Sequence, residues 1–216
     1  MRRLTRRKRK SAYHHGNLRA ALIECGLQLI EEKGLRALTL REIGSRLGVS
    51  RSAAYRHFAD KAALLSAISE AGFIEFGSAL EAARDSAPFN ASVRLQAMGI
   101  AYVRFASRHR AHFEVMFATP LEPGCPAAQA GDRAFGILEK AIRDGQQSGE
   151  FRQGDPVMLA RAVWAMVHGI SMLQLERDFD DPQFTRFASE ILKSGIQCQV
   201  PELVSPEPLP EAALNR

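Results

Sequence analysis

Hydrophobic residues along the chain recur at the spacing of helices rather than of strands. The first series steps by four, three and four positions and consists of Leu18, Leu22, Cys25 and Leu29. These steps place the series on one face of a helix that is expected to begin near His15. Lys33 followed by Gly34 predicts where this helix ends, because a cation and then a glycine are typical of a helix C-terminus.

Two short amphipathic segments follow this helix. Thr39 is a suitable N-cap and Glu42 stands three residues later, so TLRE predicts a capping box at the start of a second helix. The buried stripe of that helix is expected to consist of Leu40, Ile43, Gly44 and Leu47. Gly48 is expected to end the helix with a positive φ, and Ser50 is expected to cap a third helix.

The rest of the chain is also helical by its pattern. Asp60 is the expected N-cap of a fourth helix that runs to about Arg84. Further helices are expected over residues 90–108, 110–118, 126–148, 156–175 and 182–198. No segment with strand periodicity is long enough to predict a strand. The sequence therefore predicts an all-α fold.

The second and third helices, joined by a glycine turn, form a helix-turn-helix. At about 100° per residue, Ala54 and Phe58 of the third helix face the core. The opposite, outward arc consists of Arg51, Ser52, Tyr55 and Arg56. Guanidinium, hydroxyl and phenol groups suit base edges and phosphates. Lys61 places a cation beside the N-terminus of the fourth helix, where free backbone N–H groups already favour a phosphate.

Charge is unevenly distributed along the chain and favours a nucleic-acid partner. Residues 1–61 hold 15 Lys and Arg against 5 Asp and Glu, a balance of +10, whereas residues 62–216 have a balance of −5. Seven of the cations lie in residues 1–10, which have too few apolar residues to bury and should be disordered. This arm could follow a minor groove or simply add nonspecific affinity, and both roles predict a steep salt dependence.

These motifs resemble a known family. LTLREIGSRLGVSRSAAYRHFADK, with HHGNLRAALI at the start of the first helix, is similar to the N-terminal domain of the TetR-type bacterial transcriptional regulators. The shorter WAMVHGISML resembles the C-terminal domain of a subgroup of these regulators. The resemblance implies a three-helix DNA-binding domain at residues 13–65 and a larger helical ligand-sensing and dimerisation domain at 66–198. Residues 1–12 would be a disordered basic arm, and 199–216 a mobile Pro-rich tail.

The resemblance also assigns residues to DNA. The DNA-binding set consists of Thr39, Ser50, Arg51, Ser52, Tyr55, Arg56, His57 and Lys61. The third helix would enter the major groove, with Arg51 and Ser52 at base edges. Tyr55 and His57 would contact phosphate, as would the starts of the second and fourth helices, and the role of Arg56 stays open. The implied partner is a palindromic double-stranded operator bound by a homodimer.

The implied C-terminal domain would hold an unknown small-molecule effector in an apolar cavity. Candidate lining residues are Phe76, Met98, Tyr102, Phe105, Phe113, Phe117, Phe135, Trp164 and His168. Trp164 and His168 are four residues apart and share a helical face, so His168 could bond a ligand. The last two helices are expected to form a four-helix bundle between two protomers. Its apolar interface is predicted to consist of Val163, Val167, Ile170, Phe184, Phe187 and Ile191.

Three other functions stay open from the sequence. An architectural DNA-binding protein without an effector would suit the basic arm, although the large helical second half argues against it. A metal-dependent enzyme is suggested by His109 and His112 with Glu114 nearby, but this motif lacks a firm third ligand. The sequence also has no P-loop, dinucleotide fingerprint or nucleophile elbow. An activator cannot be separated from a repressor.

Composition indicates in which compartment the protein is expected and whether a membrane span or a disulfide framework is expected. With 46% hydrophobic and 25% charged residues, the chain has the composition of a soluble globular protein. No uninterrupted apolar run approaches the roughly 18 residues of a membrane span, and no apolar region follows the basic start as in a secretory signal. Three widely spaced cysteines fit a reducing compartment. We therefore expect a cytoplasmic regulator that is not an enzyme, with no membrane partner, resident cofactor or metal.

Overall fold

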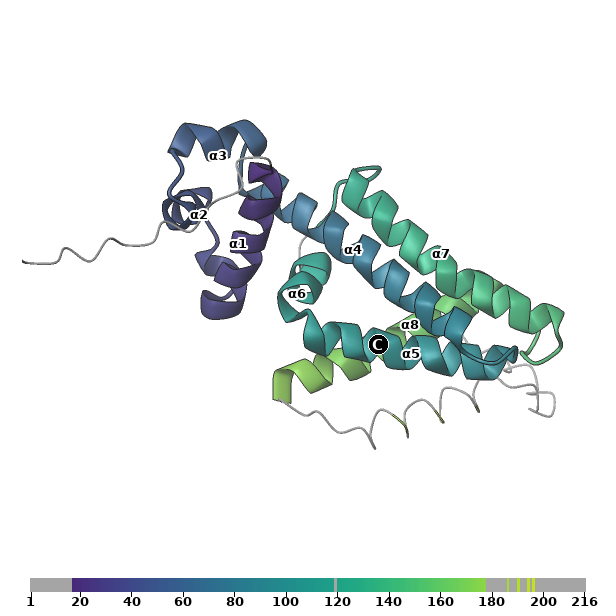
Figure 1. Cartoon of the computed structure of the whole chain (residues 1–216). Coiled ribbons are helices and arrows are strands. Elements are labelled where there is room, and N and C mark those ends of the chain that lie inside the picture. Colours follow the sequence, from purple (N-terminus) through teal and green to yellow (C-terminus); the bar gives the residue numbers. More distant parts are fainter. Residues whose placement is uncertain are drawn as a thin grey trace, which may run out of the picture. The chain divides into compact units, whose positions relative to one another are not determined.

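The computed structural model describes residues 17–118, 120–177, 186, 190, 194 and 196. Within these residues the chain is helical and contains no strand, which confirms the all-α prediction (Figure 1). The elements are α1 (Leu18–Lys33), η1 (Leu35–Ala37), α2 (Leu40–Leu47), α3 (Arg51–His57), α4 (Lys61–Ser86), α5 (Ala91–Arg108), α6 (Arg110–Ala118), α7 (Pro126–Gln147) and α8 (Pro156–Arg177). The predicted basic arm, the helix expected from Pro182 and the Pro-rich tail lie outside the described residues, apart from four isolated positions.

Two compact units make up the chain. The first unit comprises Met1–Ser78 and Phe105–Ala134, and the second comprises Ala79–Arg104 and Phe135–Arg216. The first unit therefore includes α6 and parts of α5 and α7 in addition to the helix-turn-helix. A domain boundary at residues 65 and 66 stays a prediction.

The predicted caps define the helices of the first unit. Asn17 Oδ1 accepts from Ala20 N at 3.1 Å, so α1 begins at Leu18, slightly later than the hydrophobic pattern suggested. Thr39 Oγ1 accepts from Glu42 N at 3.1 Å, as the capping box requires. The Glu42 carboxylate instead lies against Lys33 and Arg46, so only half of the capping box forms.

A Schellman turn joins α2 to α3. Gly48 has φ of 67° in the left-handed region, as expected for the residue that ends α2. Its N–H donates to Ser45 O at 3.2 Å, and Val49 N–H donates to Gly44 O at 3.0 Å. Ser50 Oγ then accepts from Ala53 N at 3.2 Å and caps α3. The end of α2 and the start of α3 are therefore both fixed by local hydrogen bonds, between residues no more than five positions apart.

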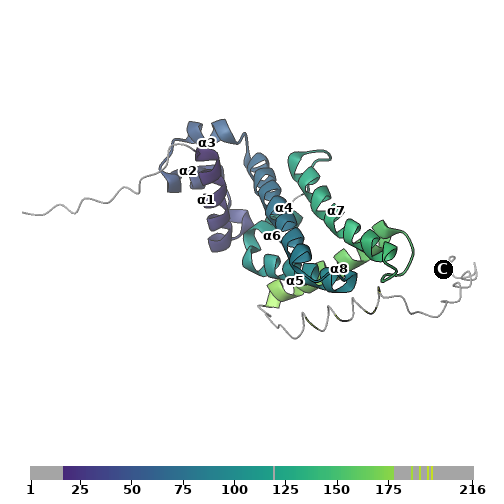
Figure 2. The same ribbon diagram turned by 45° about the vertical axis from the view of Figure 1, so that its right-hand side comes forward.

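One core holds α1 to α4 together with α6. The fully buried side chains of this core include Leu22, Leu29, Leu38, Ile43, Ala54, Leu64 and Ile68. Ala111 and Val115 of α6 are part of the same cluster, and Figure 2 shows α6 beside α1 and α4. Ser69 of α4 adds a buried hydrogen bond from its Oγ to Val115 O at 3.3 Å. The helix-turn-helix therefore packs on a core that a much later segment completes.

The second unit has its own core and its own caps. That core includes Leu95, Ile142, Phe151, Ala160, Val163 and Ile196. The Glu150 carboxylate accepts from Ala91 N at 3.0 Å and Ser92 N at 3.4 Å, at the start of α5. A negative charge at a helix N-terminus satisfies free N–H groups and complements the helix dipole. The loop before α8 is thereby tied to the first turn of α5.

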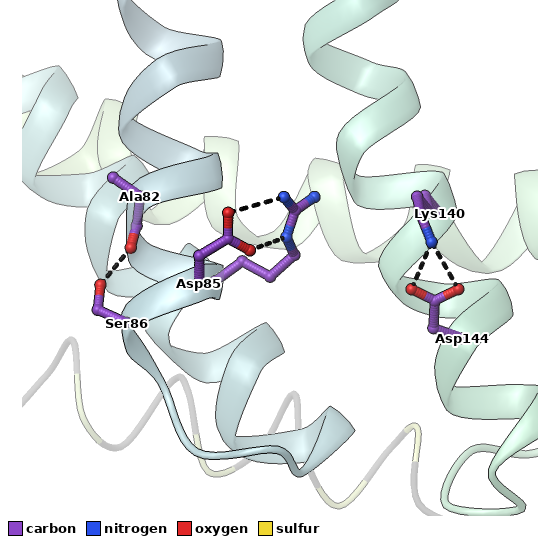
Figure 3. Close-up of polar contacts among 6 residues, drawn as sticks. Ala82, Asp85, Ser86, Lys140 and Asp144 are labelled. Atoms are coloured by element: carbon purple, nitrogen blue, oxygen red, sulfur yellow. Dashed lines mark hydrogen bonds and ion pairs between the residues drawn. The ribbon is translucent and has the colours of Figure 1, made fainter.

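Ion pairs lie on the exposed surface of α4 and α7 in the second unit. Lys140 Nζ donates to both carboxylate oxygens of Asp144 one turn later in α7, at 2.9 and 2.8 Å (Figure 3). Near the end of α4, the Arg84 guanidinium makes two hydrogen bonds to the adjacent Asp85 carboxylate. Water and salt screen such surface pairs, so the unit depends on its apolar core rather than on them.

Two helices are long and apolar enough to cross a membrane by length and composition alone. They are α4, with a mean hydropathy of 1.3, and α8, with 1.4. In α4, 56% of the apolar window is buried inside the protein, as in a core helix, whereas only 22% of the α8 window is buried. The exposed apolar surface of α8 therefore needs a separate explanation.

A glycine in α7 permits close packing in the second unit. A Cβ at Gly145 would collide with the ring of Phe151, which is only 2% exposed. We predict that Gly145→Ala lowers the free energy of unfolding by about 1–3 kcal/mol, because the ring must leave its site. Urea denaturation followed by far-UV circular dichroism measures this change.

Gly136 in the same helix is the matched control. A Cβ there meets no described atom within 4 Å. Gly136→Ala should therefore stabilise the protein by about 0.5–1 kcal/mol through helix propensity alone. Equal effects of the two substitutions would contradict the packing explanation.

Candidate nucleic-acid interface

The outward side of α3 presents the side chains that the sequence placed there. Arg51, Ser52, Tyr55, Arg56 and His57 are all exposed. On the opposite side, Ala53, Ala54 and Phe58 are buried in or against the first core. One face of α3 is therefore fixed by packing, and the other is free of described protein contacts except those within the helix-turn-helix.

Two contacts organise this exposed face before any ligand arrives. The Arg51 guanidinium carbon lies 5.2 Å from the centre of the Tyr55 ring, one helical turn away. Ser50 Oγ lies 3.1 Å from Ser52 Oγ in addition to capping the helix. Both arrangements restrict long or rotatable groups, so less conformational entropy is lost when they bind a partner.

Thr39 at the start of α2 and Lys61 at the start of α4 each make a hydrogen bond within the protein, but they differ in what remains for a ligand. Thr39 is exposed, but its hydroxyl is occupied as the cap of α2. Lys61 Nζ donates to Leu35 O at 3.0 Å and is partly buried. An ammonium group has three donors, so this bond anchors the Lys61 side chain while leaving protons for an anion.

One cation of the helix-turn-helix is engaged in ion pairs within the protein. Arg46 of α2 contacts Glu32 at 2.8 Å and Glu42 at 3.4 Å. These ion pairs tie α2 to the end of α1. The cations of α3 have no such acidic partner among the described ion pairs, so their charge is available to an anionic ligand.

The predicted sensing residues fall into two groups, one in each unit. Phe76, Phe105, Phe113 and Phe117 lie in the first unit, where Phe76–Phe105 and Phe113–Phe117 ring centres are 5.2 and 4.8 Å apart. The group in the second unit consists of Met98, Tyr102, Phe135, Trp164 and His168. Neither unit by itself therefore contains all nine of the predicted cavity-lining residues.

A polar cluster lies among the aromatic residues of the second unit. The Trp164 indole N–H donates to Tyr102 Oη at 3.2 Å, and Tyr102 Oη lies 2.9 Å from His168 Nδ1. Burial raises the pKa of Tyr102 well above its usual range, and burial lowers the pKa of His168. At neutral pH the phenol is therefore protonated and the imidazole neutral, which suits a Tyr102 O–H donated to His168 Nδ1. All three residues are predicted cavity-lining residues, but the linear sequence gives no signal that hydrogen bonds link them.

The predicted interface residues of α8 point in different directions. Val163 and Val167 are 6% and 8% exposed because they pack inside the second unit, and Ile170 is half-buried. Val163 and Val167 therefore offer little surface to a second protomer. The large exposed apolar side chains of α8 are Met158, Trp164, Met166, Met172 and Leu173. Phe184, Phe187 and Ile191 lie outside the described residues.

An acidic residue of α4, Glu75, lies close to His109, which directly precedes α6, and to His112 within α6. His109 Nδ1 lies 3.7 Å from Glu75 Oε1 in α4, whereas Glu114, the neighbour expected from the sequence, is exposed. No local signal connects Glu75 with His109, because 34 positions separate them along the chain.

Comparisons with known proteins agree with this geometry. The family described as "Bacterial regulatory proteins, tetR family" matches residues 22–68, which span most of α1 to the first turns of α4. The family described as "Tetracyclin repressor-like, C-terminal domain" matches residues 95–196. The tetracycline repressor protein class C of Escherichia coli is 45% identical over 53 residues, which cover 24% of each chain. The match thus spans about a quarter of the length of this curated relative.

Solved structures extend the similarity over both units. A protein of unknown function from Rhodococcus sp. RHA1 is 31% identical, with a TM-score of 0.77 over 87% of this chain and 100% of that one. A tetR-family regulatory protein from Rhodococcus RHA1 is 25% identical, with a TM-score of 0.70 over 84% of this chain and 97% of that one. Because both family models match in order along these helices, the chain belongs to the TetR family of bacterial transcriptional regulators.

Proposed function

We propose that this protein binds an operator through α3, as a homodimer, and represses transcription until a small molecule releases it. The observation that supports this most is the exposed row of Arg51, Ser52, Tyr55, Arg56 and His57 on a capped helix whose other face is fully packed. A rigid helix of this kind fits the major groove, where arginine and hydroxyl groups can read base edges. Such a regulator would act in the bacterial cytoplasm and would not be an enzyme.

The proposed roles follow the chemistry of each side chain. Arg51 and Ser52 would contact bases, since they lie at the N-terminal end of α3, the end that reads bases in helix-turn-helix proteins. Tyr55 and His57 would contact phosphate, and Arg56 would contact either. Thr39 and Lys61 would place the starts of α2 and α4 against the backbone, where helix N-termini favour phosphate.

A homodimer would cover the exposed stripe of α8. The stripe consists of positions related by steps of three and four residues, two of them adjacent pairs: Met158, Ala162, Ala165, Met166, Gly169, Met172 and Leu173. Six of them are exposed and Gly169 is half-buried. A helix with this stripe and only 22% burial of its apolar window is typical of a protein–protein contact. The small Ala and Gly positions would allow a second α8 to approach closely.

Repression and induction are proposed from the chain's organisation. The curated relatives are named tetracycline repressors, which supports a repressor over an activator. The α4 helix begins beside the helix-turn-helix, and its last turns belong to the second unit. An effector that moved α4 would change the spacing of two recognition helices on a palindromic operator. By linkage, DNA would weaken effector binding by the same factor.

The DNA prediction concerns α3. Arg51→Ala should weaken binding to the intergenic DNA beside the protein's own gene by about 1–3 kcal/mol, or roughly five- to 150-fold, because base contacts are lost. Fluorescence anisotropy at two salt concentrations measures this affinity against scrambled DNA of equal length. Wild-type protein should prefer the genomic DNA by about a thousandfold.

Arg143→Ala is the charge-matched control for this experiment. Arg143 is exposed in α7 and pairs only with Glu139 among the described ion pairs, so its loss should leave DNA affinity within about twofold. Equal binding of wild-type protein to genomic and scrambled DNA, unaffected by Arg51→Ala, would instead favour an architectural DNA-binding protein.

The dimer prediction concerns α8. Met166→Glu should shift the protein towards the monomer, because the carboxylate would be buried without a partner in the proposed interface. Analytical ultracentrifugation at several concentrations measures the mass. Gln147→Glu, an equal charge change at an exposed end of α7, should leave the mass unchanged. A Met166→Glu protein that stays dimeric would place the interface elsewhere.

A stability prediction concerns the polar cluster of Tyr102, Trp164 and His168 in the second unit. Tyr102→Phe removes the oxygen that both Trp164 and His168 contact and should lower the free energy of unfolding by about 1–3 kcal/mol. Urea denaturation followed by tryptophan fluorescence reports it, because Trp164 is the single tryptophan. Tyr55→Phe removes an exposed hydroxyl and should change stability by less than about 0.5 kcal/mol. A Tyr102→Phe loss as small as that of Tyr55→Phe would mean that the hydrogen bonds of the cluster contribute no net stability.

A further inference from the structure

Three metal-ligating side chains converge within the first unit. Glu75 comes from the middle of α4, His109 from the junction of α5 and α6, and His112 from the first turns of α6. Each offers one ligand atom, and these atoms all lie within 4.8 Å of one another. Among the described residues, this is the one group of three His, Cys, Asp or Glu side chains placed closely enough to share a metal ion.

The donor set selects a class of ion. Two imidazoles and one carboxylate suit borderline divalent ions such as Zn²⁺ and Co²⁺, rather than Ca²⁺ or Mg²⁺, which prefer oxygen ligands alone. Zinc–ligand distances of about 2.0–2.2 Å would place ligand atoms roughly 3.3 Å apart in a tetrahedral site. The observed spacing, within 4.8 Å, needs a closure of up to about 1.5 Å, and rotation of the exposed Glu75 side chain can supply the part that involves its carboxylate.

Packing holds the two histidines in place. The Phe105 ring stacks on His109 at 4.7 Å and 19°, which restricts the orientation of the imidazole. The His112 ring lies edge-on to His109, with ring centres 6.1 Å apart and an interplanar angle of 65°. Two of the three ligands are thus oriented before the ion arrives.

The backbone of α4 approaches α6 closely beside these ligands. A Cβ at Gly72 would lie 2.6 Å from Met116 Sδ and 3.2 Å from His112 Cδ2. Gly72 is one turn before Glu75, so the glycine lets α6 sit near enough for ligands from both helices to meet. An ordinary exposed ion pair would need neither this close approach nor the second histidine.

We infer that Glu75, His109 and His112 form a binding site for one divalent transition-metal ion, such as Zn²⁺, with a position left open for water or a further ligand. The ion would link α4 to α6 within the unit that contains the helix-turn-helix. Because Ala111 and Val115 of α6 belong to the same core as α1 and α4, the metal would favour one packing of α6 against those helices. A resulting change in DNA affinity rests on the proposed function, whereas metal binding does not.

Cobalt titration tests the site without DNA. Full-length protein stripped of metal is titrated with Co²⁺, whose visible absorption reports coordination by nitrogen in a tetrahedral site, and Zn²⁺ is then added as a competitor. Wild-type protein should bind one Co²⁺ at this site and release it to Zn²⁺. His112→Ala and Glu75→Gln should each weaken binding at least about tenfold, since even outer-shell partners of a metal ligand are worth that much.

Glu114→Gln is the matched control, because Glu114 is an exposed acid on α6 and is not one of the three converging side chains. It should leave the cobalt spectrum and affinity unchanged. Glu75 is itself exposed, so Glu75→Gln should keep the fold even if His112→Ala does not, as circular dichroism would verify. Unchanged cobalt affinity in Glu75→Gln, or no tetrahedral cobalt spectrum in wild-type protein, would overturn the proposal.

Operator binding measured with and without Zn²⁺ separates this proposal from the proposed function. A zinc-dependent change in DNA affinity of fivefold or more, lost in Glu75→Gln, would support the regulatory part. Zinc binding with unchanged DNA affinity would keep the site but remove its regulatory role. Zinc binding by a protein with no specific DNA affinity would overturn the proposed function and leave the metal site standing.

Discussion

The packing of α6 into the core beneath α1 and α4 is the constraint on which the first unit depends. The DNA-facing helices are short, and α2 and α3 bury only a few side chains each. Ala111 and Val115 close this core from a segment about 50 residues after α3, and Ser69 bonds to the backbone of α6. A change in the position of α6 would therefore reach the recognition helix α3 through α1, which both helices contact.

This arrangement gives the proposed regulator a short path for control. A two-state shift of α6 would change the same buried contacts that hold α1 and α4, so an effector or a metal on α6 needs only local contacts to influence DNA binding. Glu75, His109 and His112 lie at this junction, and the close approach at Gly72 leaves little room for intermediate positions. Packed helices of this kind prefer discrete arrangements to continuous ones.

The second unit combines an apolar core with two features that a stable core alone does not require. One is the hydrogen-bonded cluster of Tyr102, Trp164 and His168, in which polar groups are satisfied by one another. The other is the exposed apolar stripe of α8. Polar groups among aromatic rings suit recognition of a small molecule, and an apolar stripe suits a second protomer. Trp164 and His168 lie on α8 together with the stripe, so sensing and dimerisation would share this helix.

The sequence by itself determined the local structure of this protein. Caps at Thr39, Ser50 and Asp60, and the glycine turn at Gly48, act over three to five residues, so their effect could be predicted without knowing the fold. The exposed face of α3 followed from helical periodicity for the same reason. The family also followed from these residues, because the helix-turn-helix motif is contiguous.

Only the tertiary structure decided which distant residues meet. Glu75, rather than the nearby Glu114, joins His109 and His112, because α4 and α6 pack together at Gly72. Val163 and Val167 turn into the core, since an all-round apolar helix such as α8 gives no periodic signal for which face is inside. Contacts between helices far apart in the chain depend on packing geometry, and a one-dimensional pattern does not contain that information.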